Sequence, residues 1–146
     1  MLKKLKELFS NFDSMHTPSE HELHLAGAAL LIEISKADYQ RDAREQTAII
    51  AAIRSTYQLD ETALAELLAE AEMASANAPS LYDFTRVINE RCSEADKYAL
   101  VRGLWQVAFA DGNLDKYEDH MIRKIADLIY LPHSLYIKAK LEVVGG

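Results

Sequence analysis

A short acidic pattern occurs twice in this chain, and the distance between its two copies constrains the fold. Residues 37–45 read Ala-Asp-Tyr-Gln-Arg-Asp-Ala-Arg-Glu, and residues 110–118 read Ala-Asp-Gly-Asn-Leu-Asp-Lys-Tyr-Glu. One offset of 73 residues relates all three acids of the two copies (111 − 38, 115 − 42 and 118 − 45). The acids are Asp38, Asp42 and Glu45 in the first copy and Asp111, Asp115 and Glu118 in the second. Such a duplication predicts two helical hairpins that face each other across a pseudo-two-fold axis.

The same offset also pairs apolar positions, which supports a duplicated unit. It aligns Leu31 with Leu104, Ile49 with Ile122 and Tyr57 with Tyr130. Two hairpins related in this way would bring the six carboxylates to one place, and carboxylate oxygens are the ligands that hard divalent cations prefer. We therefore predict a divalent-cation site at the six acids, with Ca²⁺ as the first candidate and Mg²⁺ or Mn²⁺ as alternatives.

Composition indicates one globular domain. A chain of 146 residues can bury roughly two-thirds of its unfolded surface. Apolar residues make up 49% of the chain, against only 5 Gly and 3 Pro, which is not the composition of a disordered segment. The formal charge of −7 opposes binding to nucleic acid, which needs clustered Lys and Arg. Cys92 is the single cysteine, so no intramolecular disulfide can form.

We expect a cytoplasmic protein. Residues 1–12 lack the continuous apolar stretch of a signal peptide. The longest apolar run, residues 25–32, is too short to span a bilayer.

Hydrophobic periodicity predicts helices and gives no convincing strand. Residues 1–16 are expected to form an amphipathic N-terminal helix, residues 20–76 the first repeat, and residues 80–143 a linker helix and the second repeat. The residues predicted to open helices are Thr17 (with Pro18 at the first helical position), Asp42, Asp60, Ser80, Ser93 and Asp115. The prediction is an all-α single domain, residues 1–146, of about eight helices in two pseudo-symmetric repeats.

Three further signals predict where helices end. Residues 74–79 (Ala-Ser-Ala-Asn-Ala-Pro) should break the fourth helix and form the hinge between the repeats. Gly112 should end the helix before it in a left-handed conformation. Pro132 should stop the helix that Asp115 opens, and residues 133–143 should form the last helix.

The doubled pattern resembles the tellurite-resistance protein B (TerB) family. The resemblance is clearest in Phe-Ala-Asp-Gly-Asn-Leu-Asp at residues 109–115, which follows an apolar helix containing Trp105, and it covers roughly residues 20–143. The first copy departs from the family's Asp-Gly pattern, since Tyr39 stands in place of Gly. The resemblance implies an all-helical fold of two related halves and an acidic divalent-cation site at the six acids named above. It also implies a role in bacterial stress or membrane-associated signalling complexes rather than catalysis.

The same acids have a simpler interpretation as helix caps. In each copy the second and third acids stand three residues apart, which is the spacing of a capping box, and such a box stabilises a helix by about 1 kcal/mol without any ligand. Asp38 and Asp111 are not explained in this way, because an Asp at the end of a helix opposes the macrodipole. Two interpretations stay open: caps alone, or caps that also bind a cation. One Ca²⁺ cannot neutralise six carboxylates, so a subset coordinates, two ions bind, or Arg41 and Lys116 share the neutralisation.

Other metal sites fit the sequence less well. Residues 111–115 imitate the opening of an EF-hand loop, but Lys116 and Ile122 occupy the positions that need Gly and Glu. The Glu-x-x-His tetrad of ferritin-like di-iron proteins does not occur.

The histidines and one glutamate within an apolar helix are weaker candidates. His21 and His24, beside Glu20, have a spacing that suits Zn²⁺ or Ni²⁺, although a solvated helix start is the simpler interpretation. His120 is expected at the surface. Glu33 is expected on the least buried edge of its helix, with a buried polar contact near the axis as the alternative.

Two surfaces suggest partners. Residues 55–85 contain no Lys or Arg; their acids are Asp60, Glu61, Glu66, Glu70, Glu72 and Asp83. This segment is either a solvated face or a docking site for a basic protein. Residues 1–12 are basic and amphipathic. We expect their Leu/Phe stripe to pack on the domain or on a second copy, giving a homodimer, with contact to an anionic membrane surface as the alternative.

Three classes of function follow, in decreasing order of preference. The first is a non-enzymatic, cation-responsive TerB-like protein that acts as a stress-response or signalling interaction module with a protein partner. The second is a structural helical module whose acids are only caps. The third is a metal-dependent enzyme, which ranks last because the sequence has no nucleophile–base pair, phosphate-binding loop or Glu-x-x-His signature.

Overall fold

The computed structural model describes residues 18–36, 43–78 and 80–145. Seven α-helices and a short terminal π-helix make up this part of the chain, and it contains no strand. The elements are α2 Glu20–Lys36, α3 Ala43–Tyr57, α4 Glu61–Asn77, α5 Tyr82–Arg91, α6 Glu94–Ala108, α7 Lys116–Leu128, α8 His133–Lys140 and η1 Leu141–Gly145. The predicted all-α single domain is confirmed. The predicted helix at residues 1–16 lies outside the described residues.

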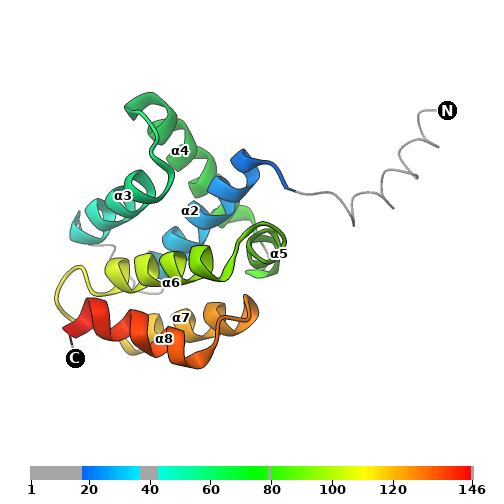
Figure 1. Cartoon of the computed structure of the whole chain (residues 1–146). Helices are drawn as coiled ribbons and strands as arrows, with labels where there is room; N and C mark the ends of the chain where they lie inside the picture. The colour runs from blue at the N-terminus through cyan, green and yellow to red at the C-terminus, as the bar shows by residue number, and fades with distance from the viewer. Residues whose placement is uncertain (1–17, 37–42, 79, 146) are drawn as a thin grey trace.

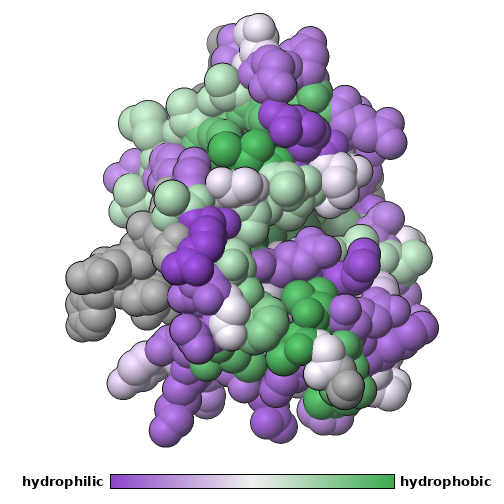
Figure 2. Space-filling view, turned by 90° about the vertical axis from the view of Figure 1, so that its left-hand side faces the viewer, coloured by the Kyte–Doolittle hydropathy of each residue, from purple (hydrophilic) through white to green (hydrophobic). Residues whose placement is uncertain are grey.

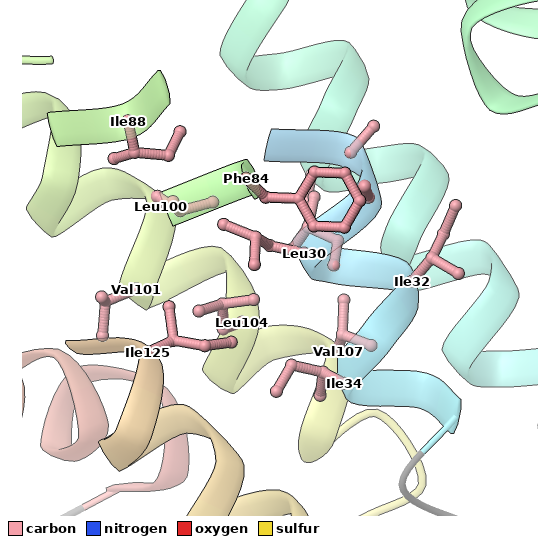
Figure 3. Close-up of a cluster of buried hydrophobic side chains, with 14 of the residues drawn as sticks. Leu30, Ile32, Ile34, Phe84, Ile88, Leu100, Val101, Leu104, Val107 and Ile125 are labelled. Atoms are coloured by element: carbon pink, nitrogen blue, oxygen red, sulfur yellow. The ribbon is translucent and has the colours of Figure 1, made fainter. Parts of the chain in front are cut away.

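Helices α2 and α6 form the centre of the fold (Figure 1). Helix α2 packs against α3, α4, α5, α6 and α7, while α6 packs against α2, α3, α7 and α8. Leu30 and Ile34 of α2 and Leu104 and Val107 of α6 have no exposed area, and Figure 3 shows these side chains in the space between the two helices. A helix that is enclosed by others must be apolar on most of its surface, which explains the long apolar run in α2. None of the described helices is long and apolar enough to cross a membrane.

Side-chain caps begin three helices as the sequence predicts. Asp60 caps α4 by accepting a hydrogen bond from the Ala63 N–H at 2.8 Å. Ser93 and Asp96 form a complete capping box at the start of α6. Asp115 caps α7. Each cap contributes about 1 kcal/mol to the stability of its helix.

The predicted start of α2 is wrong by two residues. The helix begins at Glu20, and Pro18 lies before it. Ser19 Oγ accepts from the Glu22 N–H at 3.0 Å, and the Ser19 N–H donates to Glu22 Oε1 at 2.8 Å. Ser19 and Glu22 thus form the reciprocal capping box of this helix, in which each side chain accepts from the backbone N–H of the other residue.

Two predicted helix ends also differ from the structure. Residues 74–77 continue α4 to Asn77, because a run of Ala, Ser and Asn does not oppose a helix already begun as strongly as Pro does. Helix α7 ends at Leu128, before Pro132, and Tyr130 takes a left-handed conformation with φ of +58°. Pro132 instead precedes α8 as its N-cap residue, and η1 follows α8 without a break.

Candidate cation site at the duplicated motif

The second copy of the motif forms the turn between α6 and α7. Asp115 Oδ2 accepts hydrogen bonds from the backbone N–H groups of Tyr117 at 2.9 Å and Glu118 at 3.3 Å. Asp111 Oδ1 accepts from the N–H of Asn113 at 2.9 Å, which makes an Asx turn. Both aspartates therefore stabilise the turn. This role was predicted for Asp115, whereas the Asx turn gives Asp111 a local role that the sequence analysis did not assign.

Gly112 adopts the predicted left-handed conformation, with φ of +83°. Glycine reaches this region without the steric penalty of a Cβ atom. Helix α6 has already ended at Ala108, however, and its C-cap is Phe109. The effect of a helix dipole is confined to its last turn, so Asp111 opposes the dipole of α6 less than the sequence predicted.

The glutamates of the two copies are the buried acids of the described chain. Glu45 and Glu118 are each 1% exposed, and each is the third residue of its helix, in α3 and α7. A buried carboxylate is stable only when positive charge or hydrogen-bond donors surround it. A capping-box glutamate needs no such burial, because its task is to reach a backbone N–H at the helix end. The burial of both side chains is therefore a feature beyond what capping requires.

The two copies of the motif approach each other. A shallow hollow of about 440 Å³ is lined by the first turns of α3 and by the end of α6. Ala43 and Arg44, which directly follow Asp42, line it together with Ala110, which directly precedes Asp111. In Figure 1 the start of α3 and the α6–α7 loop both lie at the left-hand side, and this side faces the viewer in Figure 2. There hydrophilic and hydrophobic residues are mixed.

The structure tests only part of the predicted ligand set. Asp38 and Asp42 lie outside the described residues. Within residues 18–36, 43–78 and 80–145, no three His, Cys, Asp or Glu side chains gather closely enough to hold a metal ion. Glu45, Asp111, Asp115 and Glu118 therefore do not form a metal cluster by themselves. Convergence of all six acids stays a prediction.

The histidine candidates have other partners. His21 Nε2 lies 3.0 Å from Glu70 of α4, while His24 stacks on the ring of Tyr57 with 4.1 Å between ring centroids. The two side chains thus contact different helices. His120 is exposed, as predicted.

Glu33 takes part in a polar contact between α2 and α4. Its carboxylate lies 3.2 Å from Lys36 Nζ and accepts a hydrogen bond from Ser75 Oγ. Lys36 Nζ also donates to Ser75 Oγ at 3.0 Å, and Ser75 is buried. Glu33 is partly exposed, as expected for the least buried edge of its helix, and it makes a part-buried polar contact there with α4. No sequence signal identifies Ser75 as the partner, because 42 residues separate the two.

The residues of the motif also fall within a known family. The family model for Tellurite resistance protein TerB matches residues 24–141. The chain belongs to the TerB family. Its TerB domain includes both copies of the motif and all of α3 to α8, together with most of α2. No curated protein and no solved structure is significantly similar to the chain.

Proposed function

We propose that this TerB domain is a non-enzymatic, cation-responsive interaction module. The observation that carries the proposal is the matched burial of Glu45 and Glu118, each 1% exposed at the third position of its helix. Glu45 and Glu118, with Asp111 and Asp115 of the same motif, carry oxygen ligands of the kind that Ca²⁺ accepts. Ca²⁺ is the first candidate, and Mg²⁺ or Mn²⁺ are alternatives. Asp38 and Asp42 would complete the ligand set.

We infer a pseudo-two-fold arrangement of two repeats, which would bring the motif copies together. Helices α3 and α7 begin 73 residues apart, at Ala43 and Lys116. The packing partners also correspond: α2 contacts α3 and α4 as α6 contacts α7 and α8, and α2 contacts α7 as α6 contacts α3. An exchange of the two halves leaves this set of contacts unchanged. A symmetric pair of hairpins is the simplest explanation.

The cation would act by joining the two halves. Each motif copy connects a central helix to the next helix, so an ion that binds both copies restrains both connections at once. The bound and free states would then differ in the surface near α3 and α7, which a partner protein can recognise. We place this switch in a cytoplasmic bacterial stress-response or signalling complex.

The partner surface that the charge pattern favours is α4. Glu61, Glu66 and Glu70 are exposed on it, and the helix contains no Lys or Arg. We propose a basic protein partner for this face. Homodimer formation or membrane contact through residues 1–12 stays a separate prediction.

A metal titration tests the proposal. Full-length protein is freed of metal with a chelator, then titrated with Ca²⁺, Mg²⁺ or Mn²⁺ by calorimetry and by thermal melting. A cation at 100 times its Kd adds roughly 2.7 kcal/mol to a domain that binds it only when folded. Asp111→Asn should lose this increment, whereas Glu66→Gln, on the exposed face of α4, should retain it. Identical melting of the wild-type protein with and without millimolar cations would contradict the proposal.

The second candidate is a structural module whose acids only cap helices. The hydrogen bonds of Asp115 and the Asx turn of Asp111 favour it. Under this reading Asp115→Asn melts close to the wild-type protein in every buffer, because Asn is as good a cap as Asp. Under the cation reading the variant matches the wild-type protein only in chelator.

A further inference from the structure

A cleft of about 630 Å³ lies apart from the duplicated motif. The first turns of α2 and α6 form two of its sides, and the ends of α3 and α5 form the others. Its apolar lining consists of Leu23, Leu59, Ile88, Ala99 and Leu100. A concave site with an apolar lining and a few convergent polar groups is the usual form of a small-molecule site.

One wall of the cleft is a stacked pair of rings. His24 and Tyr57 lie 4.1 Å apart at an interplanar angle of 28°. The position of Tyr57 depends on Gly27, because a Cβ atom at that residue would lie 2.0 Å from the Tyr57 hydroxyl oxygen. The glycine thus lets the phenol pack against α2, and this contact holds the ring in the wall. The residue after Tyr57, Gln58, has a left-handed φ of +53°, which turns the chain sharply at the edge of the cleft.

Burial shifts the pKa of three groups that line the cleft toward the neutral form. Burial raises the pKa of the Tyr57 phenol. Burial also raises the pKa of the Cys92 thiol to about 11, with the Asp96 carboxylate as a second cause. Burial lowers the pKa of His24 below its ordinary value, against the opposing charge of Glu20. Several groups with shifted pKa values in one cleft are typical of functional sites.

The rim of the cleft carries negative charge. Glu20 and Asp96 line it and are exposed, and none of the described residues that line the cleft is Lys or Arg. Arg91 and Lys97 stand outside the lining but near enough to oppose the rise in the pKa of Cys92, and Arg91 donates to the Pro18 carbonyl oxygen at 2.6 Å. Thr56 and Tyr57 belong to the last turn of α3, whose carbonyls have no partner within the helix and form the negative end of its dipole. At the starts of α2 and α6, the N–H groups of Glu22 and Asp96 donate to Ser19 and Ser93 in the two capping boxes. The charged groups at the rim are therefore acceptors, while Thr56, Tyr57 and Cys92 also provide uncharged donors.

We propose that this cleft binds a small organic cation with an aromatic body, in which a protonated amine lies between Glu20 and Asp96 and the ring packs beside His24 and Tyr57. An amine donates to the carboxylates at the rim, and a cation is attracted to the faces of aromatic rings. A metal ion does not fit this cleft. Glu20, His24, Cys92 and Asp96 all line it, yet they do not gather into a group able to hold one.

Tryptamine and indole-3-acetate test the proposal, because they share an indole ring and differ in the sign of their charge. Both are titrated into the full chain by calorimetry, and the signals of the His24 and Tyr57 rings are followed by NMR. Tryptamine should saturate at submillimolar concentration and shift both ring signals. Indole-3-acetate should bind at least about tenfold more weakly. Equal binding of the two compounds, or no saturable binding of tryptamine, overturns the proposal.

Two variants locate the site. Glu20→Gln with Asp96→Asn removes both rim charges and should lose the preference for tryptamine. Glu66→Gln with Asp83→Asn changes the net charge equally at exposed positions outside the cleft, and should keep it.

A third variant tests the cavity without altering charge. Ala99 is exposed on α6 and lines the cleft, so Ala99→Trp should fill the cleft and abolish tryptamine binding while the melting temperature stays near that of the wild-type protein. Tryptamine binding that survives in a folded Ala99→Trp protein contradicts the assignment. Because none of these changes touches the duplicated motif, failure here leaves the cation proposal unaffected, and the reverse holds too.

Discussion

Tyr57 and Tyr130 are 73 residues apart, yet their surroundings differ. Tyr57 is partly buried, stacks on His24 and packs against Gly27, whereas Tyr130 is 78% exposed. In the 73-residue offset, the position of Gly27 is matched by Leu100 of α6 (27 + 73) and not by a glycine. Both halves line the cleft, but its ring wall, made by His24 and Tyr57, comes from the first half alone.

Helices α4 and α8, which occupy matching places in the two halves of the sequence, also differ. Helix α4 has 17 residues and bears acids with no basic residue, while α8 has 8 residues, no acid, and Lys138 and Lys140. The positions nearest the centre agree instead: Ile49 of α3 and Ile122 of α7 both have no exposed area. The comparison teaches that the features shared by the two halves are those of the core and the motif. Surfaces able to distinguish partners or ligands are those in which the halves differ.

The largest expected effect tests the shared core. Ile49→Ala and Ile122→Ala each remove a fully buried side chain, and each should lower the free energy of unfolding by about 2–5 kcal/mol. If the halves are equivalent, the two values agree within about 1 kcal/mol, because the cost depends on how far each site can collapse. Denaturant unfolding measures both. A loss at one position with little effect at the other would break the comparison.

A smaller effect tests the contrast between the central glycines. A Cβ at Gly103 would make ordinary contacts, 3.6 Å from Leu31 and 3.7 Å from Ala52. Gly103→Ala should therefore stabilise the protein by up to about 1 kcal/mol through helix propensity. Gly27→Ala should destabilise it by about 1–3 kcal/mol, because the methyl group displaces the Tyr57 hydroxyl.

A double-mutant cycle identifies the cause of the Gly27 effect. If the Tyr57 hydroxyl is responsible, Tyr57→Phe should recover most of the loss caused by Gly27→Ala. An unchanged loss in the double variant would assign the effect to the backbone of α2 instead.

Gly27 illustrates the kind of feature that the sequence did not predict. Periodicity predicted the helices, and Asp60, Ser93 and Asp115 predicted three helix starts, because a cap depends on residues within one turn of the chain. The cleft was not predicted, since it depends on Gly27 meeting a side chain 30 positions later, and nothing local marks that contact. The π-helix η1 was likewise not predicted, because no pattern in the sequence of residues 141–145 was taken to indicate it.

The candidate site was predictable only in part for a related reason. The doubled spacing singled out the six acids, and parts of both copies line one hollow, but convergence of the six carboxylates stays a prediction. Burial of Glu45 and Glu118 could not be read from spacing, because a capping-box glutamate and a buried one stand at the same position of a helix. Whether such a glutamate is exposed or buried depends on how the neighbouring helices pack around it.

Removal of an N-cap should cost about 1 kcal/mol of stability in any buffer, whereas removal of a cation ligand should cost more only when the cation is present. Asp60→Ala and Asp115→Ala each remove an N-cap, and in chelator each should lower the free energy of unfolding by about 1 kcal/mol. In saturating Ca²⁺, Asp115→Ala should lose an additional increment that Asp60→Ala does not. Thermal melting in both buffers measures the difference. Equal losses in both buffers would assign Asp115 to capping alone.

The smallest expected effect is on the pH dependence of stability. It concerns His24 of the first half, whose position in the 73-residue offset is occupied by Lys97 in the second half (24 + 73). Burial lowers the pKa of His24 in the folded protein, so folding favours the neutral ring. Between its folded pKa and the unfolded value of about 6.5, the unfolded chain binds more protons at this residue, and stability falls as the pH falls through that window. His24→Phe keeps a ring to stack on Tyr57 but cannot titrate. Stability should therefore fall less for this variant than for the wild-type protein between neutral pH and pH of about 5, as measured by denaturant unfolding at each pH. Parallel pH profiles for the two proteins would mean that His24 is solvated in the folded state, and the ring wall of the cleft would then be looser than its stacking distance indicates.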